Sequence, residues 1–262
     1  MGFGSGIGCI LMDEYLVLRL DAPLMSFGSP LVDNFGKTER FISLSALTGL
    51  LANALGYDHS QHQELQQLQD RIRYAVRCDR HGQDLRDFQT AFLGLDFLSK
   101  ENAWTTWSVL DERKGGPDAQ KGTHIRYRDY IADSVYTITL RLEPPELFPT
   151  LTDAMLALRK PARPLFFGRK PCLPAAPVLF GKEEGENPLD ALKSVPPLDR
   201  QRRPQDTSEH LSAWWAPEDG GEAFGSWNDI KVADRRDWLN QVHSGQRVLR
   251  HGLISLKEVS HE

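Results

Sequence analysis

The first half of the chain opens with two patterned segments, a buried strand and an amphipathic helix. Residues 15–20 form a short apolar run that is interrupted only by Arg19, which is typical of a buried strand. Between residues 43 and 55, leucines and alanines recur at the spacing of one helix face. Ser43 or Ser45 is available as the N-cap, and Gly56 predicts the C-terminal end. We therefore expect a strand followed by a helix.

A second helix and a second strand follow, and then a long polar insertion. Residues 60–71 predict a more polar helix, and residues 72–77 alternate between apolar and polar side chains as a strand does. Residues 79–133 have little apolar periodicity and combine a Gly-Gly-Pro turn with tryptophans, tyrosines and basic side chains. This composition favours an inserted hairpin over a core element.

The segment after the insertion returns to strand and helix patterns. Residues 134–142 predict a strand, and from about residue 152 apolar side chains share one helix face until Pro161 ends it. Residues 165–167 predict a short strand. Together with the earlier elements, the order is β-α-β-β-α-β, which indicates an α+β protein of the ferredoxin-like fold.

The chain divides into three regions by composition. The first eleven residues are glycine-rich and precede Met12, and we interpret them as a flexible leader or the product of an upstream start codon. Residues 12–181 would form the ferredoxin-like domain, with the inserted hairpin at about residues 79–133. Residues 182–262 begin acidic and proline-rich, so we expect a loop-rich extension that returns to strands near its end.

The composition is that of a globular protein without secretory or membrane features. Of the 262 residues, 40% are hydrophobic and 26% are charged. There is no uninterrupted apolar stretch of about 18 residues, and the N-terminus lacks the basic and apolar regions of a secretory signal. Cys9, Cys78 and Cys172 are far apart, which argues against a disulfide framework and a structural zinc site. We expect a cytoplasmic protein with free thiols.

Charge is distributed unevenly along the sequence. The net charge of −5 gives no support to a general nucleic-acid binder, because such proteins usually carry a basic excess. Between residues 159 and 182, however, there are six basic residues and no acidic one: Arg159, Lys160, Arg163, Arg169, Lys170 and Lys182. A local basic surface is therefore expected on an acidic protein.

The common sequence signatures of enzymes are absent. The chain has no nucleotide phosphate loop, dinucleotide-binding fingerprint, His-Glu-x-x-His pair or nucleophile elbow. His59 and His62 are spaced to share a helix face, yet they lie in a glutamine-rich stretch without further ligands. We expect no metal site and no cofactor.

The turn Gly168-Arg169-Lys170-Pro171-Cys172 combines residue types that bind phosphate. Gly168 would let the backbone approach a phosphate, and Arg169 would contact two of its oxygens. Lys170 adds a point charge, and Pro171 stiffens the exit of the turn. The alternative is a solvated turn that binds nothing, and composition alone favours that alternative. Cys172 is interpreted as a packing residue.

A second candidate segment, residues 126–130, interleaves cations with aromatic rings. Proteins that bind single-stranded RNA pair phosphate contacts with base stacking in this way. In a strand, Arg126, Arg128 and Tyr130 would share one face and Tyr127 would lie on the other. The alternative is an edge strand whose tyrosines pack on the core and whose arginines are solvated, and the sequence favours neither.

A metal-independent RNA-cleaving set is also conceivable from the sequence. His124, Lys121 and Tyr127 are close enough in the chain to remove a 2′-hydroxyl proton and to protonate the leaving oxygen. Such a trio arises easily by chance. We therefore expect that the protein is not an enzyme.

Taken together, several segments resemble, in their order and in their residues, the CasD subunits of type I-E CRISPR Cascade, a family of the RAMP superfamily of RNA-binding proteins. The resemblance extends over roughly residues 12–181. The segments that carry it are Leu18–Gly28, Ser45–Gly56, Arg77–Asp79, Asp87–Thr90, Tyr127–Asp133 and Gly168–Pro174.

The resemblance implies a non-catalytic subunit in antiviral defence. A RAMP palm would hold the 5′ handle of the guide crRNA, and a thumb-like hairpin would meet the adjacent backbone subunit. Contacts with the large subunit are implied as well, and target DNA would be a partner only indirectly. In type I-C systems the corresponding subunit cleaves the precursor RNA, so an endoribonuclease that uses His124, Lys121 and Tyr127 is the alternative.

The resemblance and the two candidate segments together give the expected RNA-binding residues. They are Arg19, Met25, Ser26, Phe27, Gly28, Lys37, Arg40, Phe88, Gln89, Arg126, Tyr127, Arg128, Gly168, Arg169, Lys170 and Pro171.

Overall fold

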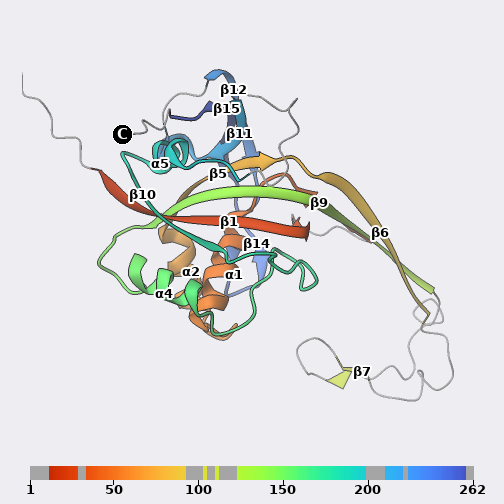
Figure 1. The fold of residues 1–262 in the computed structure, drawn as a ribbon. Helices are drawn as coiled ribbons and strands as arrows, with labels where there is room; N and C mark the ends of the chain where they lie inside the picture. The colour runs from red at the N-terminus through yellow and green to blue at the C-terminus, as the bar shows by residue number, and fades with distance from the viewer. Residues whose placement is uncertain are drawn as a thin grey trace, which may run out of the picture.

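Seven strands lie side by side in the central antiparallel sheet of the computed structural model (Figure 1), in the order β10-β1-β9-β5-β11-β15-β12. The structure describes residues 12–28, 34–92, 103–104, 110–111, 123–198, 210–220 and 224–257. The long strands are β1 (Asp13–Met25), β5 (Ile72–Arg80), β6 (Gln83–Phe92), β9 (Thr123–Leu142), β10 (Leu179–Gly185), β11 (His210–Trp215), β12 (Phe224–Val232) and β15 (Arg247–Ser255).

The remaining elements are helices and two-residue strands. The helices are α1 (Leu44–Leu55), α2 (His62–Arg71), α4 (Leu151–Arg159), α5 (Pro188–Ser194) and the 3-10 turn η2 (Pro217–Asp219). The short strands are β2 (Phe27–Gly28), β3 (Phe35–Gly36), β4 (Thr38–Glu39), β7 (Ala103–Trp104), β8 (Leu110–Asp111), β13 (Arg236–Asp237) and β14 (Val242–His243). No helix in the described part of the chain is long and apolar enough to cross a membrane.

The predicted ferredoxin-like fold is confirmed. The chain runs β1, α1 and α2, β5, β9, α4 and β10, and the four strands lie in the order β10-β1-β9-β5 with every neighbour antiparallel. The C-terminal strands β11, β15 and β12 extend this sheet beyond β5, so the terminal strands expected from the sequence are also present.

Helices cover both faces of the sheet, as Figure 1 shows. Alternate residues of β1 point to opposite faces. Leu16, Leu18 and Leu20 belong to the large buried cluster that packs against α1, α2 and α4. On the other face, α5 contributes Leu189 and Leu192 to a second cluster around Ala75, Trp215 and Ile254.

The helix ends follow the capping signals in the sequence. The Ser43 side chain accepts a hydrogen bond from the Ala46 N–H, and Gly56 ends α1 in the left-handed region at φ 84°. Thr150 and Asp153 form a reciprocal capping box at the start of α4. These caps confirm Ser43, rather than Ser45, as the N-cap.

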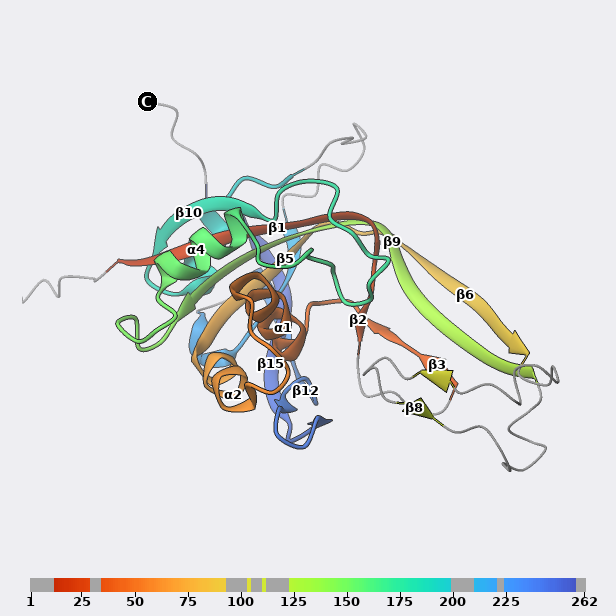
Figure 2. The ribbon, with the colours of Figure 1, turned by 90° about the horizontal axis from the view of Figure 1, so that it is seen from below.

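A two-stranded arm made of β6 and the first half of β9 projects from the sheet (Figures 1 and 2). β9 is one strand of 20 residues that runs from the arm into the sheet, where it pairs with both β1 and β5. Its partner changes from β5 to β6 near Asp133, whose φ is 57° and whose carboxylate binds Arg80 at 2.7 Å. The predicted hairpin is therefore present, but it shares its second strand with the core.

Three sequence-based expectations about the second half are wrong. The described residues 165–167 form no strand: Phe167 donates its N–H to the Cys172 carbonyl and accepts a bond from the Ser26 N–H. The expected boundary at residue 181 falls inside β10. The segment after it, expected to be loops, also contains α5 and β11. Residues 1–11 and Lys121 lie outside the described residues.

A buried ion pair fastens α5 to the sheet. Arg77 and Asp79 are 2.5 Å apart, and both side chains are fully buried. Arg77 also donates to the carbonyls of Leu192 and Val195, while Asp79 accepts from the Thr137 hydroxyl at 2.6 Å. The segment Arg77–Asp79 therefore has a structural role in the central sheet.

Replacing Arg77 should destabilise the protein strongly. In Arg77→Met, the Asp79 carboxylate stays buried without its partner, and we expect a loss of about 3–5 kcal/mol in the free energy of unfolding. Arg40→Met breaks the exposed pair with Asp84 and should cost less than about 1 kcal/mol. Urea unfolding of both variants tests this, and equal losses would show that the Arg77 network has no special weight.

Replacing Gly168 should disrupt the turn that follows α4. The residue has φ 96°, and a Cβ there would lie 1.6 Å from the Ser26 carbonyl oxygen. We expect Gly168→Ala to lower the free energy of unfolding by about 2 kcal/mol or more. Gly49→Ala is the control, because its Cβ meets no atom within 4 Å and alanine favours a helix. Unchanged thermal unfolding of Gly168→Ala would contradict the expected strain.

Candidate nucleic-acid interface

The arm presents different side chains on its two faces. In the register of the three adjacent strands, Phe35, Tyr127 and Phe88 form one row, while Gly36, Arg128 and Asp87 form the next. Consecutive rows point to opposite sides of a strand pair. We call the side with the three rings the aromatic face and the side that carries Arg126, Arg128 and Arg169 the cationic face. The predicted separation of Tyr127 from the two arginines is confirmed.

Two guanidinium groups converge at Gly36 on the cationic face. A Cβ on Gly36 would lie 2.6 Å from Nη2 of Arg169 and 3.0 Å from Nη1 of Arg128. The absence of a side chain at this position therefore gives both groups their room. Arg169 is held in place, because it donates to the Asp129 carbonyl at 2.9 Å and to the Gly36 carbonyl at 2.8 Å. It also covers the ring of Tyr130, with 4.8 Å from Cζ to the ring centroid.

The cations around Gly36 outnumber the carboxylates near them: Asp87 lies opposite Arg128 in the same row, and its carboxylate accepts a hydrogen bond from the Gln89 amide at 2.6 Å. Within the described residues, neither Arg128 nor Arg169 forms an ion pair. Lys37 follows Gly36 and Lys170 follows Arg169 in the sequence, and both lysines are exposed. The Asp129 carboxylate binds Arg86 at 2.7 Å instead. The hydrogen bond from Arg86, with added charge from Arg169 and Lys37, holds the pKa of Asp129 below its usual value.

This arrangement suits a bound phosphate. Two guanidinium groups side by side repel each other, and an anion between them replaces that repulsion with attraction. Guanidinium groups also match the oxygens of a phosphate in pairs. The cationic face thus carries two adjacent guanidinium groups at Gly36 whose geometry is compatible with one phosphate.

The aromatic face carries a row of rings across three strands. Phe35 stacks on Tyr127 with the ring centroids 5.0 Å apart and the planes within 7°. Phe88 lies on the other side of Tyr127 at 5.5 Å, with its plane tilted by 58°. Phe35 and Phe88 are 44% and 56% exposed. Exposed rings in such a row are unusual on a surface that binds nothing.

The structure brings most of the predicted basic residues to the arm. Arg126 contacts the Asn34 side chain, and Arg128 and Arg169 meet at Gly36. Arg40 pairs with Asp84 at the base of the arm, and Gln89 binds Asp87. As RNA contacts, all of these positions stay predictions.

Five predicted residues in β1, in β2 and between them have other surroundings. The side chains of Met25, Ser26 and Phe27 are buried, so only their backbone atoms can reach RNA. Gly28 follows them as the last residue of β2. Arg19 lies six residues before Met25, roughly 20 Å along an extended strand. It donates to the Pro196 carbonyl and covers the ring of Phe180, away from Gly36.

The basic turn differs in detail from its expected role. Gly168 faces the Ser26 carbonyl, so its missing side chain serves a contact between chain segments rather than an approach to phosphate. Lys170 and Pro171 are exposed. Cys172 is buried, and burial raises the pKa of its thiol, which confirms it as a packing residue.

The alternative catalytic set is not assembled by the strand. His124 and Tyr127 are three residues apart in β9, so their side chains point to opposite faces. Both sides of the Tyr127 ring are occupied by Phe35 and Phe88. Among the described residues, no three His, Cys, Asp or Glu side chains are grouped to hold a metal ion.

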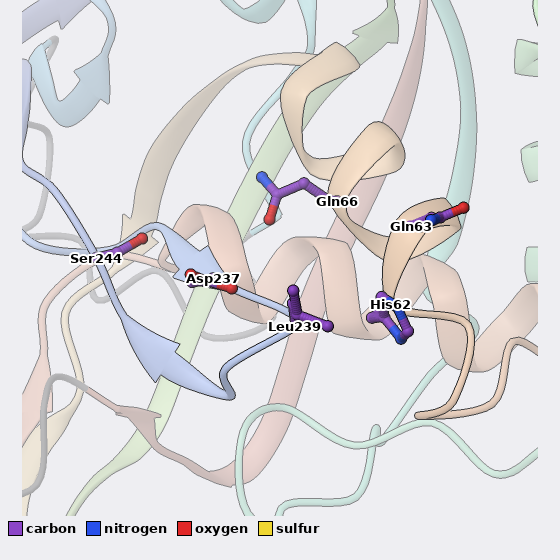
Figure 3. Close-up of a pocket in the computed structure, with 6 residues that line it drawn as sticks. All are labelled: His62, Gln63, Gln66, Asp237, Leu239 and Ser244. Atoms are coloured by element: carbon purple, nitrogen blue, oxygen red, sulfur yellow. The ribbon is translucent and has the colours of Figure 1, made fainter.

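A shallow groove of about 440 Å³ lies elsewhere, between α2 and the β13–β14 hairpin (Figure 3). Its lining includes His62, Gln63 and Gln66 from α2 and Leu239 from the hairpin. The carboxylate of Asp237 already accepts two bonds from Asn240. The groove contains none of the predicted RNA-binding residues.

Sequence reasoning missed Asn34, Phe35 and Gly36 as parts of this surface. They pair with β9 across about 90 residues of intervening chain, through a parallel strand of only two residues. An aromatic residue, a glycine and a lysine in succession were the only local signal.

Comparisons with known proteins identify the family of the chain and agree with its fold. The sequence profile described as "CRISPR-associated protein (Cas_Cas5)" matches residues 15–250. The CRISPR system Cascade subunit CasD of Escherichia coli (strain K12) is 28% identical over 187 residues, which are 71% of this chain and 79% of that protein.

Two solved structures share the fold. A chain of a "CRISPR RNA-guided surveillance complex" covers 92% of this chain and 90% of its own length, with a TM-score of 0.61 and 21% identity. A second, "Crystal structure of Cas protein", covers 92% and 95%, with a TM-score of 0.57 and 22% identity. The resemblance found in the sequence is therefore confirmed, and the chain belongs to the Cas5 family of CRISPR-associated proteins as a CasD-like member.

Proposed function

We propose that the chain is a non-catalytic crRNA-binding subunit of a type I-E CRISPR Cascade complex. It holds the 5′ handle of the guide RNA, contacts the backbone and large subunits, meets target DNA only indirectly, and acts in the cytoplasm. The observation that carries this proposal is the pair of guanidinium groups, Arg128 and Arg169, that converge at Gly36 without a carboxylate partner among the described residues.

The assignment to a complex draws on the relatives. The CasD protein of Escherichia coli is named as a Cascade subunit, and a structural neighbour belongs to an RNA-guided surveillance complex. A net charge of −5 fits a subunit that grips one short RNA segment locally and leaves the rest to its partners. Affinity for RNA alone should then be modest and strongly dependent on salt.

The arrangement of the arm supports a binding role over a cleaving one. General acid–base cleavage needs two groups within reach of the same phosphodiester. His124 and Tyr127 point to opposite faces, and the Tyr127 ring is enclosed by two phenylalanines. No observation in the described part of the chain favours the endoribonuclease.

Reversing the charge at Arg128 should weaken RNA binding. Arg128 is preferable to Arg169 for this test, because Arg169 also holds two backbone carbonyls. For Arg128→Glu we expect the dissociation constant for labelled 5′-handle RNA to rise by about tenfold or more. The slope of log affinity against log salt should fall by about 0.7 for the lost phosphate contact.

Lys231→Glu provides the matched control, because Lys231 is an exposed cation on the edge strand β12, four strands away from β9 in the sheet. It should leave both the affinity and the salt slope unchanged. Equal effects of the two variants would mean that only the overall charge matters, and an Arg128→Glu variant with normal affinity would refute the proposed site.

The purified protein should not cleave precursor RNA. Labelled repeat RNA incubated with it in EDTA should remain intact, because His124 and Tyr127 point to opposite faces of β9. Site-specific cleavage that disappears in His124→Ala would instead establish the endoribonuclease and overturn the non-catalytic role.

A further inference from the structure

We propose that Phe88 is a stacking platform for one unpaired base of the bound RNA, with Tyr127 and Phe35 as its support. This inference rests on the proposed function, because it concerns the same arm and the same ligand. It assigns the aromatic face a role distinct from that of the cationic face.

The ring of Tyr127 is not available for a base. Phe35 stacks on one side of it with planes within 7°, and Phe88 closes the other side. A base inserted next to Tyr127 would have to displace a phenylalanine. The stacking residue suggested by the sequence pattern of residues 126–130 is therefore part of the support.

Phe88 is the open end of the row. Its side chain is 56% exposed, more than that of Phe35 at 44%, and it is tilted by 58° away from the plane of Tyr127. It lies on β6, whose outer edge pairs with no other described strand. One more flat ring can add to the row on this side without moving any side chain of the row.

The surroundings of Phe88 favour a nucleobase as that ring. Arg86 and Thr90 lie two residues before and after Phe88 on the same strand, so they share its face, where Arg86 is paired with Asp129 at 2.7 Å. Alternate residues of β6 also direct their backbone N–H and C=O groups to the open edge, where they can meet the polar edge of a base. Rings next to cations and backbone donors are typical of single-strand binders.

The guanidinium pair at Gly36 lies in the row of residues next to the rings, on the opposite face of the same narrow ribbon. A nucleotide chain that crosses the edge of β6 would place its phosphates and one base on different faces. Stacking does not depend strongly on base identity, so Phe88 would fix the position of a base without selecting its type.

The test uses the assembled complex with 2-aminopurine placed at one position of the 5′ handle at a time. This base fluoresces weakly when stacked and strongly when free. In the wild type, we expect one position to be quenched relative to its neighbours. In Phe88→Leu the fluorescence at that position should rise several-fold, and in Phe88→Trp the quenching should persist. The affinity for the RNA should fall by roughly tenfold in Phe88→Leu.

Phe148→Leu is the matched control, because Phe148 is another exposed phenylalanine, 71% exposed, outside the arm. It should leave the quenching intact. Identical fluorescence at every position in the wild type and in Phe88→Leu would overturn the inference, provided that RNA is bound. Release of a neighbouring protein subunit by Phe88→Leu with unchanged fluorescence would also overturn it, since the ring would then be a protein contact.

The outcome is separable from that of the proposed function. If Phe88→Leu has no effect while Arg128→Glu weakens RNA binding, only the stacking platform fails. If Arg128→Glu has no effect and no position is quenched, the RNA-binding role of the arm fails as a whole.

Discussion

The pairing register of β9 is the constraint on which the central sheet and the arm both depend. This strand of 20 residues pairs with β1 and β5 in the sheet and with β6 and β3 on the arm. Because side chains alternate along a strand, a shift of one residue would exchange the two faces of the arm. The buried side chains of Ile138, Leu140 and Leu142 hold the register in the core. The core thereby fixes which side of the arm carries Arg126 and Arg128 and which carries the row of rings.

The positive charge of the arm is local and does not reflect a basic protein. The chain is acidic as a whole, yet Arg128 and Arg169 are brought together over a glycine. The bonds from Arg169 to two backbone carbonyls fix its position before any ligand arrives. A fixed guanidinium loses little side-chain entropy on binding, which favours affinity. The electrostatic repulsion between Arg128 and Arg169 is unfavourable in the free protein, and a phosphate bound between them would offset it.

The sequence predicts well those parts of the structure that rest on local periodicity. The leucine spacing of α1, its cap at Ser43 and the apolar run of β1 lead directly to the ferredoxin-like order of elements. Residues 165–167 are apolar enough for a strand, but their backbone bonds go to Ser26 and Cys172 instead. The pairing of Phe35 and Gly36 with β9 is long-range, so no local pattern reveals it. The sequence therefore pointed to Arg128 and Arg169, but not to Gly36, the residue at which they converge.

The most direct test of the central claim is a double-mutant cycle that combines the loss of one phosphate charge with the loss of the Arg128 side chain. Each phosphate of the 5′ handle would be replaced in turn by a neutral methylphosphonate, and the affinity would be measured for the wild type and for Arg128→Ala. We predict one position at which the neutral linkage weakens binding to the wild type and has no further effect on the variant. If the two changes are additive at every position, Arg128 does not hold a phosphate, and the site at Gly36 is not the grip on the guide RNA.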